Sequence, residues 1–142
     1  MRNEEMMPTE REWLLMEAIW DYEDGLGKNK IGSEEGITSA EILKRVRTKS
    51  EMTDRTERVL LHHLVRKEIV GFTVDASDSR VYHYFSKKNR EECLKDKQQD
   101  FINIYYQGSL VGAVASMLND PELSDKDIQE LEKMIRKRKN DG

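Results

Sequence analysis

The sequence contains a single cysteine, two prolines and no long apolar run. One cysteine, Cys93, forms no internal disulfide and supplies no four-thiolate metal site. The longest nearly apolar stretch, from Leu110 to Leu118, is too short to cross a bilayer. The first residues lack the apolar core and the small-residue cleavage site of a secretory signal. These absences predict a cytoplasmic protein without a membrane partner, whose stability comes from packing.

The 142 residues suit one domain, or one compact head with a small appended element. Charge is distributed unevenly within a net of −4. Between Lys44 and Arg90 there are twelve basic and six acidic residues, whereas the rest has twelve basic and twenty-two acidic ones. A basic middle between acidic ends can attract a polyanion, although a merely solvated face would have the same composition.

A capping box marks the start of the first predicted helix. Thr9 is followed three residues later by Glu12, a spacing that satisfies free backbone N–H groups at a helix start. Apolar residues recur at helical spacing from there to about Tyr22. The segment Glu23–Gly36 has four glycines and no periodicity, so we expect an exposed loop.

Two further helices are predicted before residue 69. Thr38 and Glu41 repeat the capping box and begin a short helix that runs to about Lys49. Thr53 caps the next helix, whose apolar stripe consists of Leu60, Leu61, Leu64 and Val65. At about 100° per residue, the opposite side is mostly cationic and comprises Arg55, Arg58, Val59, His62 and Arg66.

A β-hairpin follows the third helix. The runs Ile69–Val74 and Arg80–Phe85 are β-branched and aromatic, and the polar segment Asp75–Ser79 separates them. Since side chains alternate along a strand, either Tyr82 and Tyr84 or His83 faces inward. Three helices followed by a hairpin are the order of a winged helix. The predicted fold class is therefore mainly α with a small β-hairpin wing, and residues 1–88 form a winged helix-turn-helix DNA-binding domain.

Residues 89–142 are predicted to form a helical dimerisation region. Its three helices start near Asn89, Ser109 and Ser124, and Pro121 breaks the second. About fifty residues bury little apolar surface alone, so this surface needs the head domain or a second copy as a partner. A homodimer is the simpler arrangement. Its predicted contacts are Phe101, Ile104, Tyr105, Leu110, Val114, Leu118, Ile128, Leu131 and Ile135.

Several segments resemble the penicillinase and methicillin-resistance repressor family, which also includes copper-responsive repressors. The resemblance spans nearly the whole chain and is most specific in the third helix. The segments that carry it are Glu12–Trp20, Thr38–Ile42, Thr53–Lys67, Arg80–Tyr84 and Asp100–Leu110. The resemblance implies a homodimeric repressor that binds a palindromic, double-stranded DNA operator and blocks transcription.

In antibiotic-responsive members of this family, a regulatory protease relieves repression by cutting between Asn and Phe. The equivalent bond here joins Asp100 and Phe101, so Asp replaces the family's Asn. The cysteine-rich tail of the copper-responsive members is absent, and no metal or other cofactor is predicted. Two further departures are the glycine-containing insertion after the first helix and Glu57, at a position that is usually apolar. A carboxylate near a helix start is compatible with the helix dipole.

This interpretation assigns roles to the predicted DNA-binding residues. Arg55 donates two hydrogen bonds to guanine, Val59 contacts a thymine methyl, and Thr56 lies beside them in the first helical turn. Backbone N–H groups at Thr38 and Ser39 face a phosphate. His62 lies on the same side of the third helix as Arg55. The other phosphate contacts are Arg58, Arg66, Lys67 and Arg80.

Two alternatives belong to other functional classes. A winged-helix module that binds proteins and has no affinity for DNA would also account for the acidic remainder. An enzyme has no support, because no paired carboxylates, nucleophile–base spacing, phosphate-binding glycine loop or metal motif is visible. His62 and His63 are adjacent, so they point in different helical directions and do not favour joint chelation.

Overall fold

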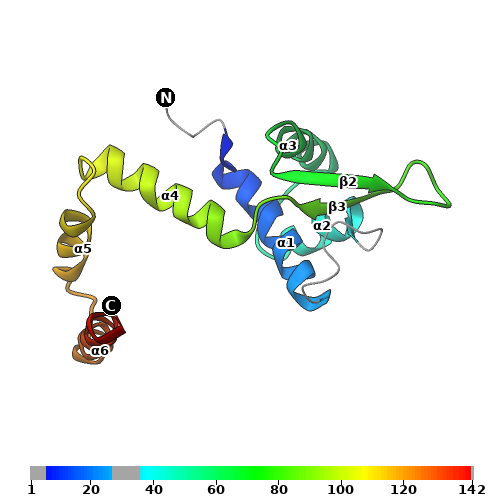
Figure 1. Cartoon of the computed structure of the whole chain (residues 1–142). Coiled ribbons are helices and arrows are strands. Elements are labelled where there is room, and N and C mark those ends of the chain that lie inside the picture. Colours follow the sequence, from blue (N-terminus) through cyan, green and yellow to red (C-terminus); the bar gives the residue numbers. More distant parts are fainter. Residues whose placement is uncertain (1–5, 27–35, 142) are drawn as a thin grey trace. The chain divides into compact units, whose positions relative to one another are not determined.

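The structure, a computed structural model, describes residues 6–26 and 36–141. The chain divides into two compact units, Met1–Asp100 and Phe101–Gly142. Most of the glycine-containing insertion, residues 27–35, lies outside the described residues. The elements in chain order are α1 (Glu10–Leu26), β1 (Ile37–Thr38), α2 (Ser39–Val46), α3 (Asp54–Arg66), β2 (Val70–Val74), β3 (Tyr82–Ser86), α4 (Arg90–Tyr105), α5 (Leu110–Leu118) and α6 (Asp125–Asp141) (Figure 1).

The first unit has one hydrophobic core, which α1, α2, α3 and the sheet enclose. Its fully buried side chains include Leu15, Ile19, Ile42, Leu64 and Ile69. Each comes from the apolar side of its own segment, so burial of these sides packs the three helices together. The order of three helices and a hairpin is the winged-helix fold that the sequence predicts.

Helix α1 begins as expected and ends later than expected. The capping box is present, since Thr9 N donates to Glu12 Oε1 at 2.9 Å and Glu12 N donates to Thr9 Oγ1 at 3.2 Å. The predicted end near Tyr22 is wrong, because the helix continues to Leu26. Glu23 is buried there and accepts hydrogen bonds from Ser86 N at 2.7 Å and Ser86 Oγ at 2.6 Å. A glutamate that was expected in an exposed loop thus anchors the end of β3.

The wing is a three-stranded antiparallel sheet in the order β1-β3-β2. The predicted hairpin pairs β2 with β3, and the loop between them projects beyond the helices of this unit (Figure 1). Strand β1 was not predicted, because two residues are too few to show alternation. It pairs Ile37 with Tyr84 and Thr38 with His83, which joins the start of α2 directly to the wing.

The two faces of the wing are both partly covered. Tyr84 packs against the core, whereas Tyr82 is 39% exposed and the His83 side chain is 16% exposed, so the strand does not simply turn both tyrosines inward and His83 outward. On the face that carries Tyr84, the rings of Phe72 and Tyr82 stack with centroids 4.7 Å apart. His83 lies on the opposite face, where its ring contacts Gly36 and Asp75.

The second unit has well-capped helices and almost no buried surface of its own. Ser109 Oγ accepts from Gly112 N at 2.8 Å at the start of α5, and Ser124 Oγ accepts from Asp127 N at 3.1 Å at the start of α6. Among its described residues, only Ala113 is buried. Within residues 6–26 and 36–141, no helix is both long enough and apolar enough to cross a membrane.

Candidate nucleic-acid interface

Helix α3 separates its apolar and cationic residues onto opposite sides. The Thr53 side chain accepts from Thr56 N at 3.1 Å and caps the helix as predicted. Leu61 and Leu64 are buried, and Leu60 and Val65 pack against the same core. The other side carries the residues with exposed side chains, namely Arg55, Arg58, Val59, His62 and Arg66. The cationic side is therefore displayed to solvent within the described part of the chain.

The amino end of α2, the first half of α3 and the loop end of β3 line one open hollow of about 420 Å³. Thr38 caps α2, because its hydroxyl accepts from Glu41 N at 3.3 Å. Glu41 bonds to Arg45 instead of completing the predicted box. Four residues predicted to contact DNA border this hollow and come from β1, α2, α3 and the loop between β2 and β3, respectively: Thr38, Ser39, Arg58 and Arg80. The fold thus brings together positions that are 42 residues apart in the sequence.

Glu57 closes the inner side of this hollow and is 2% exposed. Its Oε1 accepts a hydrogen bond of 2.7 Å from Ser39 Oγ, which ties α3 to the start of α2. Burial raises the pKa of the Glu57 carboxyl, and the Ser39 hydrogen bond opposes this effect. Two features of the sequence agree with this burial: Glu57 stands at a position that is usually apolar in the family, and it lies three and four residues before Leu60 and Leu61 of the apolar stripe.

The tip of the wing is ordered by its own carboxylates. Asp75 Oδ2 accepts from Ser77 N at 3.0 Å and Ser77 Oγ at 2.8 Å, and Asp75 Oδ1 lies 2.8 Å from His83 Nε2. The contact with His83 is the main reason that the pKa of Asp75 lies below its usual range. His83 Nδ1 lies 3.0 Å from Gly36 O. Both partners of the ring are acceptors, so the imidazolium form, which donates from both nitrogens, satisfies both contacts.

Arg80 stands at the outer edge of the wing. Its Nε donates to Asp78 Oδ1 at 3.1 Å, and 88% of its side chain is exposed. A surface ion pair of this kind contributes little stability and is easily exchanged for a phosphate contact. Arg80 is thus available to DNA in a way that a buried cation is not.

The structure gives Lys67 a different partner from the one predicted. Its Nζ donates to Glu12 Oε1 at 2.7 Å and to Met7 O at 3.0 Å, and only 18% of its side chain is exposed. Glu12 is itself buried and otherwise accepts from the uncharged Thr9 N, so the ammonium group supplies the positive charge that compensates this carboxylate. This intramolecular role accounts for Lys67 better than a phosphate contact does.

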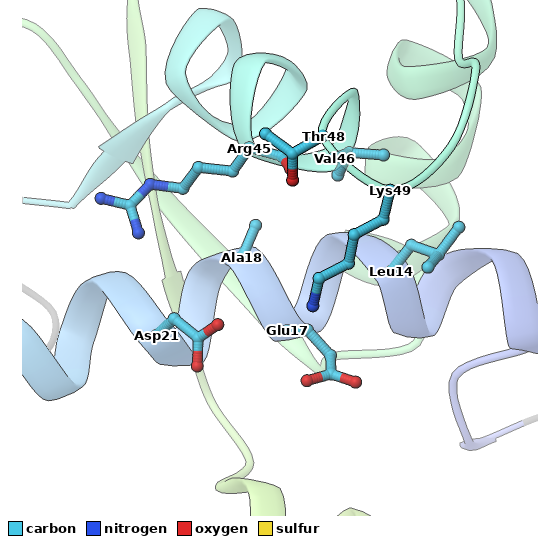
Figure 2. A pocket seen from close by; sticks show the side chains of 8 residues that line it. All are labelled: Leu14, Glu17, Ala18, Asp21, Arg45, Val46, Thr48 and Lys49. Atoms are coloured by element: carbon cyan, nitrogen blue, oxygen red, sulfur yellow. The ribbon is translucent and has the colours of Figure 1, made fainter.

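A smaller hollow of about 240 Å³ lies away from the cationic side of α3, between α1 and the end of α2. Figure 2 shows Lys49 extended toward Glu17 across it, with Asp21 and Arg45 farther along the two helices. It contains none of the predicted DNA-binding residues. In the described parts of the chain, no three His, Cys, Asp or Glu side chains are grouped to hold a metal ion. Cys93 is buried, which raises the pKa of its thiol.

One family matches over most of the chain, and this match identifies the family of the protein. The family described as penicillinase repressor matches residues 8–137. The chain belongs to the penicillinase repressor family. The resemblance predicted from the sequence segments is thereby confirmed, and membership places the chain among transcriptional repressors and not among enzymes.

Individual relatives of this family member are distant but cover most of its length. A penicillinase repressor of Staphylococcus aureus is 25% identical over 135 residues, which are 95% of this chain and 95% of that protein. The methicillin resistance regulatory protein MecI of Staphylococcus aureus (strain N315) is 23% identical over 127 residues, covering 89% of this chain and 91% of that protein. The crystal structure of an S. aureus MepR–DNA complex matches with a TM-score of 0.46 and 19% identity, over 82% of each chain.

The second unit of this penicillinase repressor family member carries most of its exposed apolar side chains. Of the nine predicted dimer contacts, Leu131 is partly buried. The other eight are exposed by 40% or more of their surface: Phe101, Ile104, Tyr105, Leu110, Val114, Leu118, Ile128 and Ile135. Large apolar patches of this kind mark surfaces that another molecule covers.

The bond between Asp100 and Phe101, where the family resemblance places cleavage, lies inside α4. The Phe101 ring contacts those of Tyr105 and Tyr106, with centroids 5.2 Å and 5.7 Å apart. Because i→i+4 hydrogen bonds hold a helical peptide bond, access by a protease requires that α4 first unwinds locally.

Proposed function

We propose that this protein is a homodimeric transcriptional repressor that binds a palindromic DNA operator through α3 and the wing. The observation that carries the proposal is the exposed cationic side of α3, which adjoins a hollow bordered by the start of α2 and by Arg80 of the wing. A helix presenting arginines beside a helix amino terminus suits one DNA groove and its flanking phosphates.

The side chains divide into two groups in this proposal. Arg55, Thr56 and Val59 lie in the first half of α3 and read base edges, with Arg55 on a guanine and Val59 on a thymine methyl. The others contact the backbone or lie along it: Thr38, Ser39, Arg58, His62, Arg66 and Arg80. Lys67 is left out of both groups because Glu12 and Met7 hold its ammonium group.

The second unit supplies the partner surface. Two copies bury the apolar side chains of α4, α5 and α6 against each other, and the pairing sets the distance between the two α3 helices. Release of the operator by cleavage between Asp100 and Phe101 belongs to the same proposal. Cleavage would separate the DNA-binding unit from most of the dimer surface.

The proposal is tested by selecting bound duplexes from a random-sequence DNA library with the purified protein. We expect a two-fold symmetric motif, and an affinity for it that falls steeply as the salt concentration rises. If no duplex shows salt-sensitive retention even at low ionic strength, the alternative of a protein-binding module gains support. A selected sequence without symmetry would contradict the dimeric part of the proposal alone.

Substitutions of two arginines on the same side of α3 test base recognition and phosphate contact separately. Arg55→Ala is expected to lower the affinity for the selected duplex by about 1–3 kcal/mol and to relax preference at one base position per half-site. Arg66→Ala is expected to weaken binding to all DNA sequences alike. It is also expected to reduce the slope of log affinity against log salt concentration by about one per site. Competition binding with single-base variants of the duplex measures both effects. Equal losses on every sequence for Arg55→Ala would contradict its assignment to a base.

A further inference from the structure

One buried ionisable group of α3, which borders the hollow at the start of α2, has no place in the binding scheme above. Glu57 is 2% exposed, and its Oε1 accepts from Ser39 Oγ at 2.7 Å. Its Oε2 is also buried and accepts no hydrogen bond from any residue that the structure describes. An ionised carboxylate in such a site lacks the donors that would compensate for its loss of water. Protonation removes that cost.

The charged and titratable groups around Glu57 only partly offset its burial. Asp54 on α3 disfavours the ionised form, whereas Arg47 and Arg58 favour it less strongly than burial opposes it. A guanidinium nitrogen of Arg47 also lies 3.7 Å from Asp54 Oδ1, so Arg47 forms an ion pair with that carboxylate as well. From the wing, Arg80 and Tyr82 border the same hollow, and the Tyr84 hydroxyl interacts with the Glu57 charge. Together these effects raise the pKa of Glu57 above its ordinary value of 4.5.

Glu57 also lies beside the predicted phosphate position at the start of α2. Ser39 borders the hollow, and its hydroxyl already donates to Glu57. A phosphate held by the amino end of α2 therefore brings a second anion near a carboxylate that is poorly compensated. The two negative charges repel each other, so a proton on Glu57 is favoured further.

We propose that DNA binding is coupled to the uptake of one proton by Glu57 in each protomer, so that affinity for DNA rises as the pH falls. The proton comes from solvent and is held at Oε2, while Oε1 keeps its bond from Ser39. This inference rests on the proposed function, because the anion that approaches Glu57 is a DNA phosphate.

The direction of the pH dependence follows from the linkage between proton binding and DNA binding. Glu57 holds its proton up to a higher pH in the complex than in the free protein. Between the pKa of Glu57 in the free protein and its pKa in the complex, each unit of falling pH tightens DNA binding by up to about tenfold per copy of Glu57. Above and below that window the contribution is constant.

Histidines on the same surface require a control. His62 on α3 and His83 in the wing belong to the same surface as Glu57. A pH dependence of the unaltered protein therefore does not identify the group. The comparison between Glu57→Gln and the unaltered protein does, since Gln keeps the shape of the protonated form and cannot titrate.

The experiment measures binding of the full chain to the duplex recovered by selection, between about pH 5 and pH 8. Calorimetry in two buffers of different ionisation enthalpy counts the protons taken up. We expect Glu57→Gln and Glu57→Met to take up fewer protons than the unaltered protein and to bind more tightly than it at the high-pH end. Glu51→Gln, which removes an exposed carboxylate that does not border the hollow, is expected to keep the uptake. Thermal unfolding verifies that each variant is folded.

Equal proton uptake by the unaltered protein and both Glu57 variants would overturn the coupling and leave the proposed function intact. Absence of salt-sensitive DNA binding at every pH would overturn the proposed function, and the coupling with it. Carbon NMR of the Glu57 carboxyl provides an independent measurement. It should show the protonation midpoint at a higher pH with the duplex than without it, and an unchanged midpoint would also overturn the coupling.

Discussion

Replacing Leu110 and Val114 together by glutamate is expected to give a monomer in solution and to weaken operator binding by about 10²–10⁴-fold. The two side chains are 61% and 46% exposed and lie one turn apart on the same side of α5. In a dimer, four carboxylates would be forced into an apolar interface, whereas in a monomer they would face water. A single DNA-binding unit then loses the gain in effective concentration that its linked partner supplies.

Light scattering gives the mass of this double variant, and titration of the selected duplex gives its affinity. Lys126→Glu changes the net charge by the same amount on an exposed residue of α6, and is expected to retain both the dimer and most of the affinity. A double variant that remains dimeric and still protects both half-sites would show that other surfaces join the copies. A monomeric unaltered protein would refute the dimer at once.

Lys67→Met is expected to lower the free energy of unfolding by about 3–5 kcal/mol. The substitution removes the ammonium group that lies 2.7 Å from Glu12 Oε1 and leaves a carboxylate that is 1% exposed. His63 Nδ1, at 3.7 Å from Glu12 Oε2, is too distant to replace it with a hydrogen bond. Chemical denaturation followed by circular dichroism measures the loss.

Two further variants distinguish this pair from a general effect of losing a lysine. Lys87→Met removes an exposed lysine from the same unit and is expected to change stability by less than about 0.5 kcal/mol. In the double variant Glu12→Gln/Lys67→Met, the unpaired charge is gone, so part of the stability should return. If Lys67→Met instead left stability unchanged and reduced the salt slope of DNA binding, Lys67 would be a phosphate contact after all.

Local patterns predicted the parts of this protein that depend on neighbours within a helical turn. The Thr9–Glu12 box, the Thr53 cap and the two sides of α3 each involve residues three or four positions apart. Such spacings are visible in the sequence because the helix itself sets them. The same reasoning identified the side of α3 that the structure leaves exposed.

The features that were missed depend on partners far along the chain. Glu23 meets Ser86 across 63 residues, and Glu12 meets Lys67 across 55. Glu23 was expected in an exposed loop and Glu12 only in a capping box, since no local signal shows that a carboxylate is buried and paired with a distant residue. Strand β1 could not be predicted for a related reason, because its two residues form a strand only by pairing with β3.

Thr38 joins the two halves of the predicted interface in a way that limits how the protein can adapt to its target. Its backbone belongs to the sheet opposite His83, and its hydroxyl holds the first turn of α2. The wing and the first turn of α2 are thus joined directly, with no loop between them. If the protein binds its operator as proposed, we expect a target that does not match this joined surface to have to deform, so that DNA stiffness contributes to discrimination at base pairs that no side chain touches.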